Sequence, residues 1–128
     1  MWASPLPQSQ FVATYQRTKI GINMHMSYGP SNLRMWQLPI NGVMQITDNP
    51  KGTEELFELN KEIVCYENGD MDEAIDKIKY YLDHNDERIA IARAGYERAL
   101  RDYSYEKCFL SSIKEIEKGI QNKRESKR

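Results

Sequence analysis

Residues 18–58 constrain the possible fold more than any other part of the sequence. Residues 19–26 have the pattern of a short apolar strand, and the turn residues at 28–30 separate them from a helical stretch that ends at Asn41-Gly42. Residues 43–47 are a second, almost continuous apolar run, typical of a parallel sheet covered by helices on both faces. Such a strand–turn–helix–strand unit predicts an open α/β fold, in which ligands bind beyond the carboxyl ends of the strands.

A third strand is predicted at residues 62–66, and after Asn68-Gly69 the pattern is wholly helical. We therefore predict an α/β fold with a partial, Rossmann-like parallel sheet of about three strands and a C-terminal helical extension. The chain is expected to be a single partial domain, 1–128. Within it, residues 9–67 form the Rossmann-like part, 70–121 the C-terminal helices and 122–128 a disordered basic tail.

Three helices are predicted in the extension. Asp70 and Glu73 have the spacing of a capping box, which starts the first helix. Each helix carries one apolar stripe that we expect to be buried. The stripes are Met71, Ala74, Ile75, Ile78 and Leu82; then Ile89, Ala92, Tyr96 and Leu100; then Phe109, Ile113, Ile116 and Ile120.

Composition excludes several classes of function. A formal net charge of −1 argues against a nucleic-acid binder, which needs basic residues gathered on one face. Cys65 and Cys108 are far apart and the histidines are not clustered, so we expect no metal site and two buried thiols in a reducing compartment. No apolar run is long enough for a transmembrane segment and no signal peptide is visible, which predicts a cytoplasmic location.

The turn between the first strand and the first long helix could bind an anion. Gly29 would allow a ligand to approach the backbone, Ser31 and Asn32 would donate hydrogen bonds, and Arg34 could pair with a phosphate. The alternative is a helix that is merely capped by Ser31 or Asn32. The position of the turn, at the carboxyl end of a predicted strand, favours the anion site.

Several runs, in this order and spacing, resemble the C-terminal half of group 1 (GT-B type) glycosyltransferases. The chain is most similar to the spore-maturation (CgeB-like) branch, in which a lysine-led strand precedes an arginine-led helix and a glycine precedes a strand ending in aspartate. The runs that carry the resemblance are 18–25, 31–37, 41–48, 52–57, 93–98 and 103–106.

The resemblance implies a transferase of two Rossmann domains. This half would bind the nucleotide-sugar donor, its only small-molecule ligand, and a missing N-terminal half or partner chain would bind the acceptor. By position, Ser31, Asn32 and Arg34 would lie near the donor diphosphate, and the loop with Gly52, Glu54 and Glu55 would face the donor.

The chain departs from the family's pattern at two positions. Gln37 occupies the place of a ribose-binding glutamate, and Gly29 stands where a second acid is common. A glutamine still accepts a hydroxyl hydrogen bond through its carbonyl, but without charge.

Three side-chain roles stay open. His25 is a candidate general base at a strand end, although no carboxylate partner is visible and a structural role is the alternative. Trp36 could stack on a base or sugar, or belong to the core. Glu54 and Glu55 could face the donor, or supply favourable charge at a helix N-terminus.

We expect a glycosyltransferase donor-binding domain that is inactive alone, with catalysis resting on stabilisation of the departing diphosphate. The last helix would cross toward the missing half, leaving part of its apolar face exposed here. The alternative is a non-catalytic α/β binding or interaction module that has lost the donor site. A response-regulator-like domain is disfavoured, because no acidic cluster follows the first strand.

Overall fold

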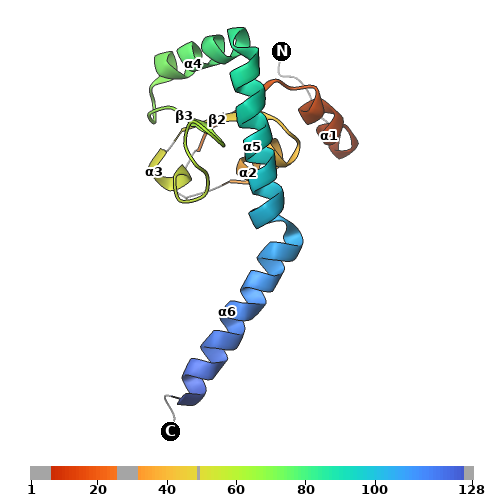
Figure 1. The fold of residues 1–128 in the computed structure, drawn as a ribbon, viewed down its shortest axis with the longest axis vertical. Helices are drawn as coiled ribbons and strands as arrows, with labels where there is room; N and C mark the ends of the chain where they lie inside the picture. The colour runs from red at the N-terminus through yellow and green to blue at the C-terminus, as the bar shows by residue number, and fades with distance from the viewer. Residues whose placement is uncertain (1–6, 26–31, 49, 126–128) are drawn as a thin grey trace.

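The computed structural model describes residues 7–25, 32–48 and 50–125. These residues form a small parallel sheet packed between helices, from which one long helix extends away (Figure 1). The strands β1 (Ile20–Asn23), β2 (Met44–Thr47) and β3 (Val64–Cys65) pair in parallel in the order β1-β2-β3. The predicted α/β class, with a partial Rossmann-like sheet followed by C-terminal helices, is confirmed.

The helices follow the predicted order but not all the predicted limits. They are α1 (Gln8–Gln16), α2 (Arg34–Ile40), α3 (Pro50–Thr53), α4 (Met71–Asp83), α5 (Asn85–Tyr103) and α6 (Tyr105–Glu125). Glu54 and Glu55 were considered for the N-terminus of a helix, whereas α3 ends at Thr53, before both of them. Proline is favoured in the first helical turn, so the helix starts at Pro50 and the acidic residues follow it.

One face of the sheet is apolar. Met44 and Ile46 of β2 and Val64 of β3 point to this face, with Ile20 of β1 packed against them. α4 and α5 cover it through Ala74, Ile78, Tyr81, Ile91 and Ala92. Ile22, in contrast, is 49% exposed, so the apolar core reaches only the first half of β1.

The opposite face is polar and lies under α2. Asn23, Gln45 and Thr47 point to it and are at most 1% exposed. Gly21 lies on the same face, where a Cβ atom would stand 2.4 Å from a methyl carbon of Leu38 in α2. Glycine thus allows α2 to pack directly on β1. The row of buried polar side chains leads toward the carboxyl ends of the strands.

The buried face of α5 is not the one predicted. The predicted residues Ile89, Tyr96 and Leu100 are 51%, 39% and 45% exposed. The buried residues are instead Arg88, Ile91, Gly95 and Ala99. A Cβ atom on Gly95 would lie 2.5 Å from the carbonyl oxygen of Glu62, so α5 packs by its small residues against the backbone before β3. The close approach of α5 to the backbone at Glu62 thus buries Gly95 and Ala99, and the larger apolar side chains at Tyr96 and Leu100 stay partly exposed.

Asp70 begins α4, but the reciprocal half of the predicted capping box is absent. Asp70 accepts a hydrogen bond from the backbone N–H of Glu73 at 2.9 Å. The Glu73 carboxylate accepts from the backbone N–H of Glu67 at 2.7 Å and pairs with Lys77 at 2.7 Å. The predicted α4 stripe is buried only in part, since Met71, Ile75 and Leu82 are 47%, 43% and 49% exposed.

α6 extends away from the rest of the chain as a separate rod (Figure 1). None of its residues is buried, so the prediction of a buried stripe on this helix is wrong. Cys108 is also exposed, contrary to prediction, whereas Cys65 is buried as expected. The tail predicted to be disordered from residue 122 is helical up to Glu125, and residues 126–128 lie outside the described residues.

Candidate functional site

The candidate site lies at the carboxyl ends of β1 and β2. His25 follows the end of β1 by two residues, and Asp48 directly follows β2. Parallel neighbouring strands end at the same edge of a sheet, so both residues lie at this edge. Gly29 and Ser31, predicted to line the same site, fall outside the described residues.

Asp48 binds His25 through both the backbone and the side chain. The carboxylate oxygens accept the backbone N–H of His25 at 2.9 and 3.1 Å, and Oδ1 lies 2.5 Å from the ring nitrogen Nδ1. The two side chains are only 5% and 6% exposed. The expectation that His25 has no carboxylate partner is therefore wrong. An ionised carboxylate only accepts hydrogen bonds, so Nδ1 of His25 is the donor in this contact, and Nε2 is then an acceptor in the neutral form of the ring.

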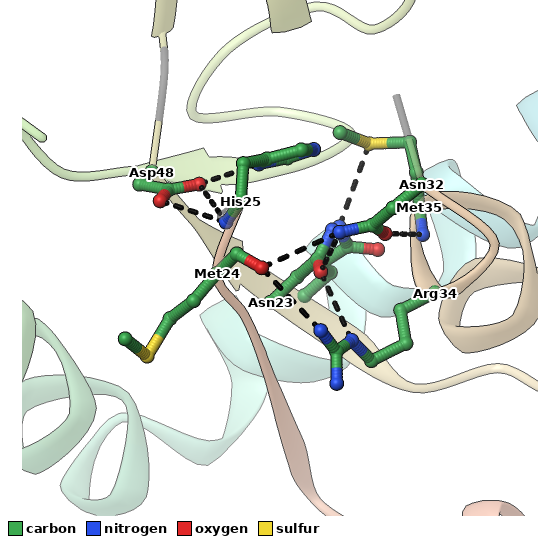
Figure 2. A network of polar contacts seen from close by, with 8 residues as sticks. Asn23, Met24, His25, Asn32, Arg34, Met35 and Asp48 are labelled. Carbon is green, nitrogen blue, oxygen red and sulfur yellow. Dashed lines mark hydrogen bonds and ion pairs between the residues drawn. The ribbon is translucent and has the colours of Figure 1, made fainter. Parts of the chain in front are cut away.

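Asn32 and Arg34 converge on the end of β1. Figure 2 shows both side chains directed at Asn23 and at the backbone of Met24. The Oδ1 atom of Asn23 accepts from Asn32 Nδ2 at 2.8 Å and from Arg34 Nε at 3.2 Å. The Met24 carbonyl oxygen accepts from Asn32 Nδ2 and from Arg34 Nη2, each at 3.4 Å. The predicted neighbours Asn32 and Arg34 thus share the same two acceptors.

Asn32 also caps the helix that carries Arg34. Its Oδ1 atom accepts the backbone N–H of Met35 at 3.2 Å, which satisfies one of the free donors at the start of α2. The capping role left open from the sequence is present, and it coexists with the bonds to β1. Asn32 therefore fixes α2 to the end of the strand and sets the position of Arg34.

The charge of Arg34 is not neutralised by a carboxylate within the described part of the chain. The acceptors that it binds are an amide oxygen and a backbone carbonyl oxygen, both uncharged. The side chain is exposed at the sheet edge. A guanidinium held in place by neutral oxygens retains its attraction for an anion, and its planar donors suit a phosphate.

Gln37 and Trp36 lie further along α2. Gln37 accepts a hydrogen bond from the hydroxyl of Tyr15 in α1 at 3.3 Å. The Trp36 ring packs on Tyr103 and Phe57, with ring centroids 4.4 and 5.8 Å apart. Trp36 thus packs against the core cluster of Met35, Phe57 and Ile63, one of the two roles considered for it from the sequence. The structure does not bring Gln37 into the polar network of Asn23 and Arg34.

The remaining predicted residues, Gly52, Glu54 and Glu55, lie in or just after α3. Both glutamates are exposed and follow the helix, so neither supplies charge at its N-terminus. Burial raises the pKa of the Cys65 thiol to about 11, although a hydrogen bond with Thr53 and the charge of Lys77 act in the opposite direction. Burial, and to a lesser extent Asp48, also raises the pKa of Tyr66.

Buried polar atoms without a hydrogen-bond partner concentrate near this edge. Within the described residues they include Asn23 Nδ2, Gln45 Oε1 and Thr47 Oγ1 on the polar face, and Nε2 of His25. An unpaired buried polar group usually costs about 1–3 kcal/mol. Such groups call for an explanation, and functional sites are one place where they occur.

The described residues offer neither a metal centre nor a membrane-spanning helix. Nowhere in them do three or more histidine, cysteine, aspartate or glutamate side chains gather in a way that could hold a metal ion. Among the helices described, none is both long and apolar enough to cross a membrane.

Comparison with known families decides the broader identity. A family model described as glycosyl transferase-like matches residues 1–111, which is most of the chain. The chain belongs to the glycosyl transferase-like family. A search of the curated proteins gives no match. The family assignment agrees with the resemblance seen in the sequence at the level of glycosyl transfer, and it implies a sugar donor as substrate.

In this glycosyl transferase-like chain, sequence reasoning missed two residues of the site, Asp48 and Asn23. A signal was available for Asp48, because His25 and Asp48 follow two strands predicted to be parallel neighbours. Asn23 was missed for a different reason. It falls inside a strand whose alternate residues, Ile20 and Ile22, suggested the opposite face as the buried one.

Proposed function

We propose that this chain is the donor-binding part of a glycosyltransferase and holds a nucleotide-activated sugar at the carboxyl edge of its sheet. The observation that carries the proposal is Arg34, an exposed guanidinium fixed over the end of β1 by neutral oxygens and without a carboxylate partner in the described residues. Family membership supports the sugar donor. The sequence resemblance supports the finer assignment to the GT-B type and its CgeB-like branch.

In this proposal Arg34 binds the donor diphosphate. Its bonds to Asn23 and Met24 hold the guanidinium plane, so little side-chain entropy is lost when a phosphate binds. Gly29, Ser31 and the backbone beside Asn32 are proposed to face the same diphosphate.

Gln37 is proposed to lie near the ribose, and Gly52, Glu54 and Glu55 near the sugar. The amide of Gln37 is engaged by Tyr15, so a ribose hydroxyl would have to share or replace that bond. Glu54 and Glu55 are exposed, and their carboxylates can accept hydrogen bonds from sugar hydroxyls.

The chemistry that this site supports is electrostatic. Sugar transfer leaves negative charge on the departing diphosphate, and a fixed guanidinium stabilises that charge as it develops. We further propose that the acceptor site belongs to an N-terminal half or partner chain, so that the 128-residue chain alone transfers sugar slowly or not at all. Both cysteines are free, which supports a reducing, cytoplasmic compartment.

The direct test is calorimetric titration of the chain with UDP, GDP, UDP-glucose and GDP-mannose. We expect saturable binding of at least one probe, weakened by about tenfold or more in Arg34→Ala, because a hydrogen bond to a charged group contributes about 1.5–3 kcal/mol. Arg93→Ala is the matched control, since Arg93 is an exposed arginine that pairs with Glu97 on α5. Absence of binding by the folded chain, or equal binding by both variants, would contradict the proposal.

A second candidate is a non-catalytic interaction module, and one observation favours it. An open groove of about 470 Å³ runs between α2, α5 and α6, with Leu33, Trp36, Ile40 and Tyr103 among its lining residues. It leads onto the exposed apolar residues of α6. A folded chain that binds none of the four nucleotide probes would make this candidate the better one.

A further inference from the structure

The pair of His25 and Asp48 has a feature that binding of a diphosphate by Arg34 does not use. The Asp48 carboxylate contacts Nδ1 of the His25 ring and accepts hydrogen bonds from the backbone N–H of His25. The other ring nitrogen, Nε2, is buried and has no hydrogen-bond partner among the described residues. A carboxylate that orients a histidine in this way fixes which ring nitrogen carries the proton.

We propose that Nε2 of His25 accepts a hydrogen bond from a hydroxyl group of the bound nucleotide sugar, and that Asp48 is the positioning residue that holds the ring for this contact. The inference rests on the proposed donor site. His25 would then bind the donor from the end of β1, outside α2 and the α3 loop, and it would contact a hydroxyl group and not a phosphate.

The choice of a hydroxyl follows from the tautomer. With Nδ1–H donating to Asp48, the neutral ring offers only a lone pair at Nε2, and a lone pair needs a donor. A diphosphate carries acceptors, whereas ribose and sugar hydroxyls can donate. The nearby carboxylate of Asp48 also makes this end of the strands less suited to an anion than the position of Arg34.

The surroundings of the pair agree with a polar ligand. Asn23 and Thr47, register partners at the ends of β1 and β2, each have a buried side-chain atom without a partner in the described residues. Figure 2 places the His25–Asp48 pair beside the network of Asn23, Asn32 and Arg34. Nε2 is covered by neighbouring atoms, so a hydroxyl reaches it only when that cover shifts.

The test reads the histidine ring directly by long-range ¹H–¹⁵N NMR. The chain has two histidines, and His84→Gln assigns the signals of His25. His84 is exposed, and its ring contacts the carbonyl oxygen and the ring of Tyr80, away from the strand ends, so this substitution leaves the site unchanged. The spectrum without nucleotide is expected to show the tautomer protonated at Nδ1; a proton on Nε2 in the neutral ring would overturn the inference.

The probes are UDP, 2′-deoxy-UDP, 3′-deoxy-UDP and UDP-glucose, with the GDP series as a second set, and calorimetry under the same conditions reports binding. A shift of the Nε2 resonance with UDP but not with 2′-deoxy-UDP assigns the ribose 2′-hydroxyl. A shift with both that is lost with 3′-deoxy-UDP assigns the 3′-hydroxyl, and a shift only with UDP-glucose assigns the sugar. Each of these outcomes supports the inference.

Binding that leaves Nε2 unchanged overturns the inference but not the proposed function. If no probe binds, the proposed function fails and the inference fails with it.

Asp48→Asn keeps the side-chain shape and tests the positioning role. We expect this variant to lower the population of the Nδ1–H tautomer and to weaken nucleotide binding by about three- to tenfold, the range of one hydrogen bond. An unchanged tautomer and an unchanged affinity would show that Asp48 does not position the ring.

Discussion

Gly95 of α5 lies against the carbonyl oxygen of Glu62, so closely that a Cβ atom there would stand 2.5 Å from that oxygen. The contact joins α5 to the backbone just before β3. It also places Arg98, one turn further along α5, 3.8 Å from the Glu62 carboxylate. The direction of α5 across the sheet therefore depends on a residue without a side chain.

Gly95→Ala is expected to destabilise the fold by about 1–3 kcal/mol, the usual cost of overpacking, although alanine favours a helix more than glycine. Backbone rather than a flexible side chain opposes the new methyl group, so relaxation is limited. Urea unfolding followed by circular dichroism measures the change. Gly119→Ala is the control, because a Cβ atom at Gly119 in α6 meets nothing within 4 Å. Equal stability of Gly95→Ala and the parent chain would show that α5 does not pack as described.

The stability of the fold should fall in acid in part through Glu73. Its bonds to Lys77 and to the backbone N–H of Glu67 lower the pKa of this carboxyl from its ordinary value of 4.5. A carboxyl whose pKa is lower in the folded state contributes stability that is present above the unfolded-state pKa and is lost as pH falls through the folded-state pKa. Glu73→Gln should therefore lose stability at neutral pH and show a flatter dependence of unfolding free energy on pH below about 5.

Thermal unfolding of Glu73→Gln and the parent chain across that pH range checks this expectation. Glu117→Gln is a suitable control, since Glu117 is an exposed glutamate on α6. Parallel curves for Glu73→Gln and the parent chain would contradict the role given to Glu73 at the start of α4.

The two thiols should differ in reactivity. Cys108 is exposed on α6, whereas burial raises the pKa of the Cys65 thiol to about 11. Because the thiolate is the reactive form, a thiol reagent at pH 8 should modify Cys108 quickly and Cys65 only on unfolding. Cys108→Ser should abolish the fast phase. Two equally fast thiols in the folded chain would show that the end of β3 is open to solvent.

The sequence pattern predicted the parts of the fold that depend on long apolar runs and strong turn signals. The parallel pairing of β1 with β2, the end of α2 near Gly42 and the start of α4 at Asp70 follow from such signals. The buried face of α5 could not be predicted in the same way. Its apolar residues suggested one face, but the close approach allowed by Gly95 selected the neighbouring one.

The candidate site was predicted in part. Asn32 and Arg34 were named from the sequence, and the structure brings them together at Asn23. The contact of His25 with Asp48, which joins residues 23 positions apart, was missed because it is visible only when the ends of the two parallel strands are compared with each other. Periodicity within one element carries no information on such a contact.

The most direct test of the central claim, donor binding at the carboxyl edge of the sheet, is a map of backbone amide shifts on adding the tightest-binding nucleotide diphosphate. The account predicts that the largest changes fall at residues 23–25, 32–35 and 47–48, around Arg34 and the His25–Asp48 pair. Changes confined to residues 99–108, on the α5 and α6 side of the groove, would place the ligand elsewhere and contradict the account.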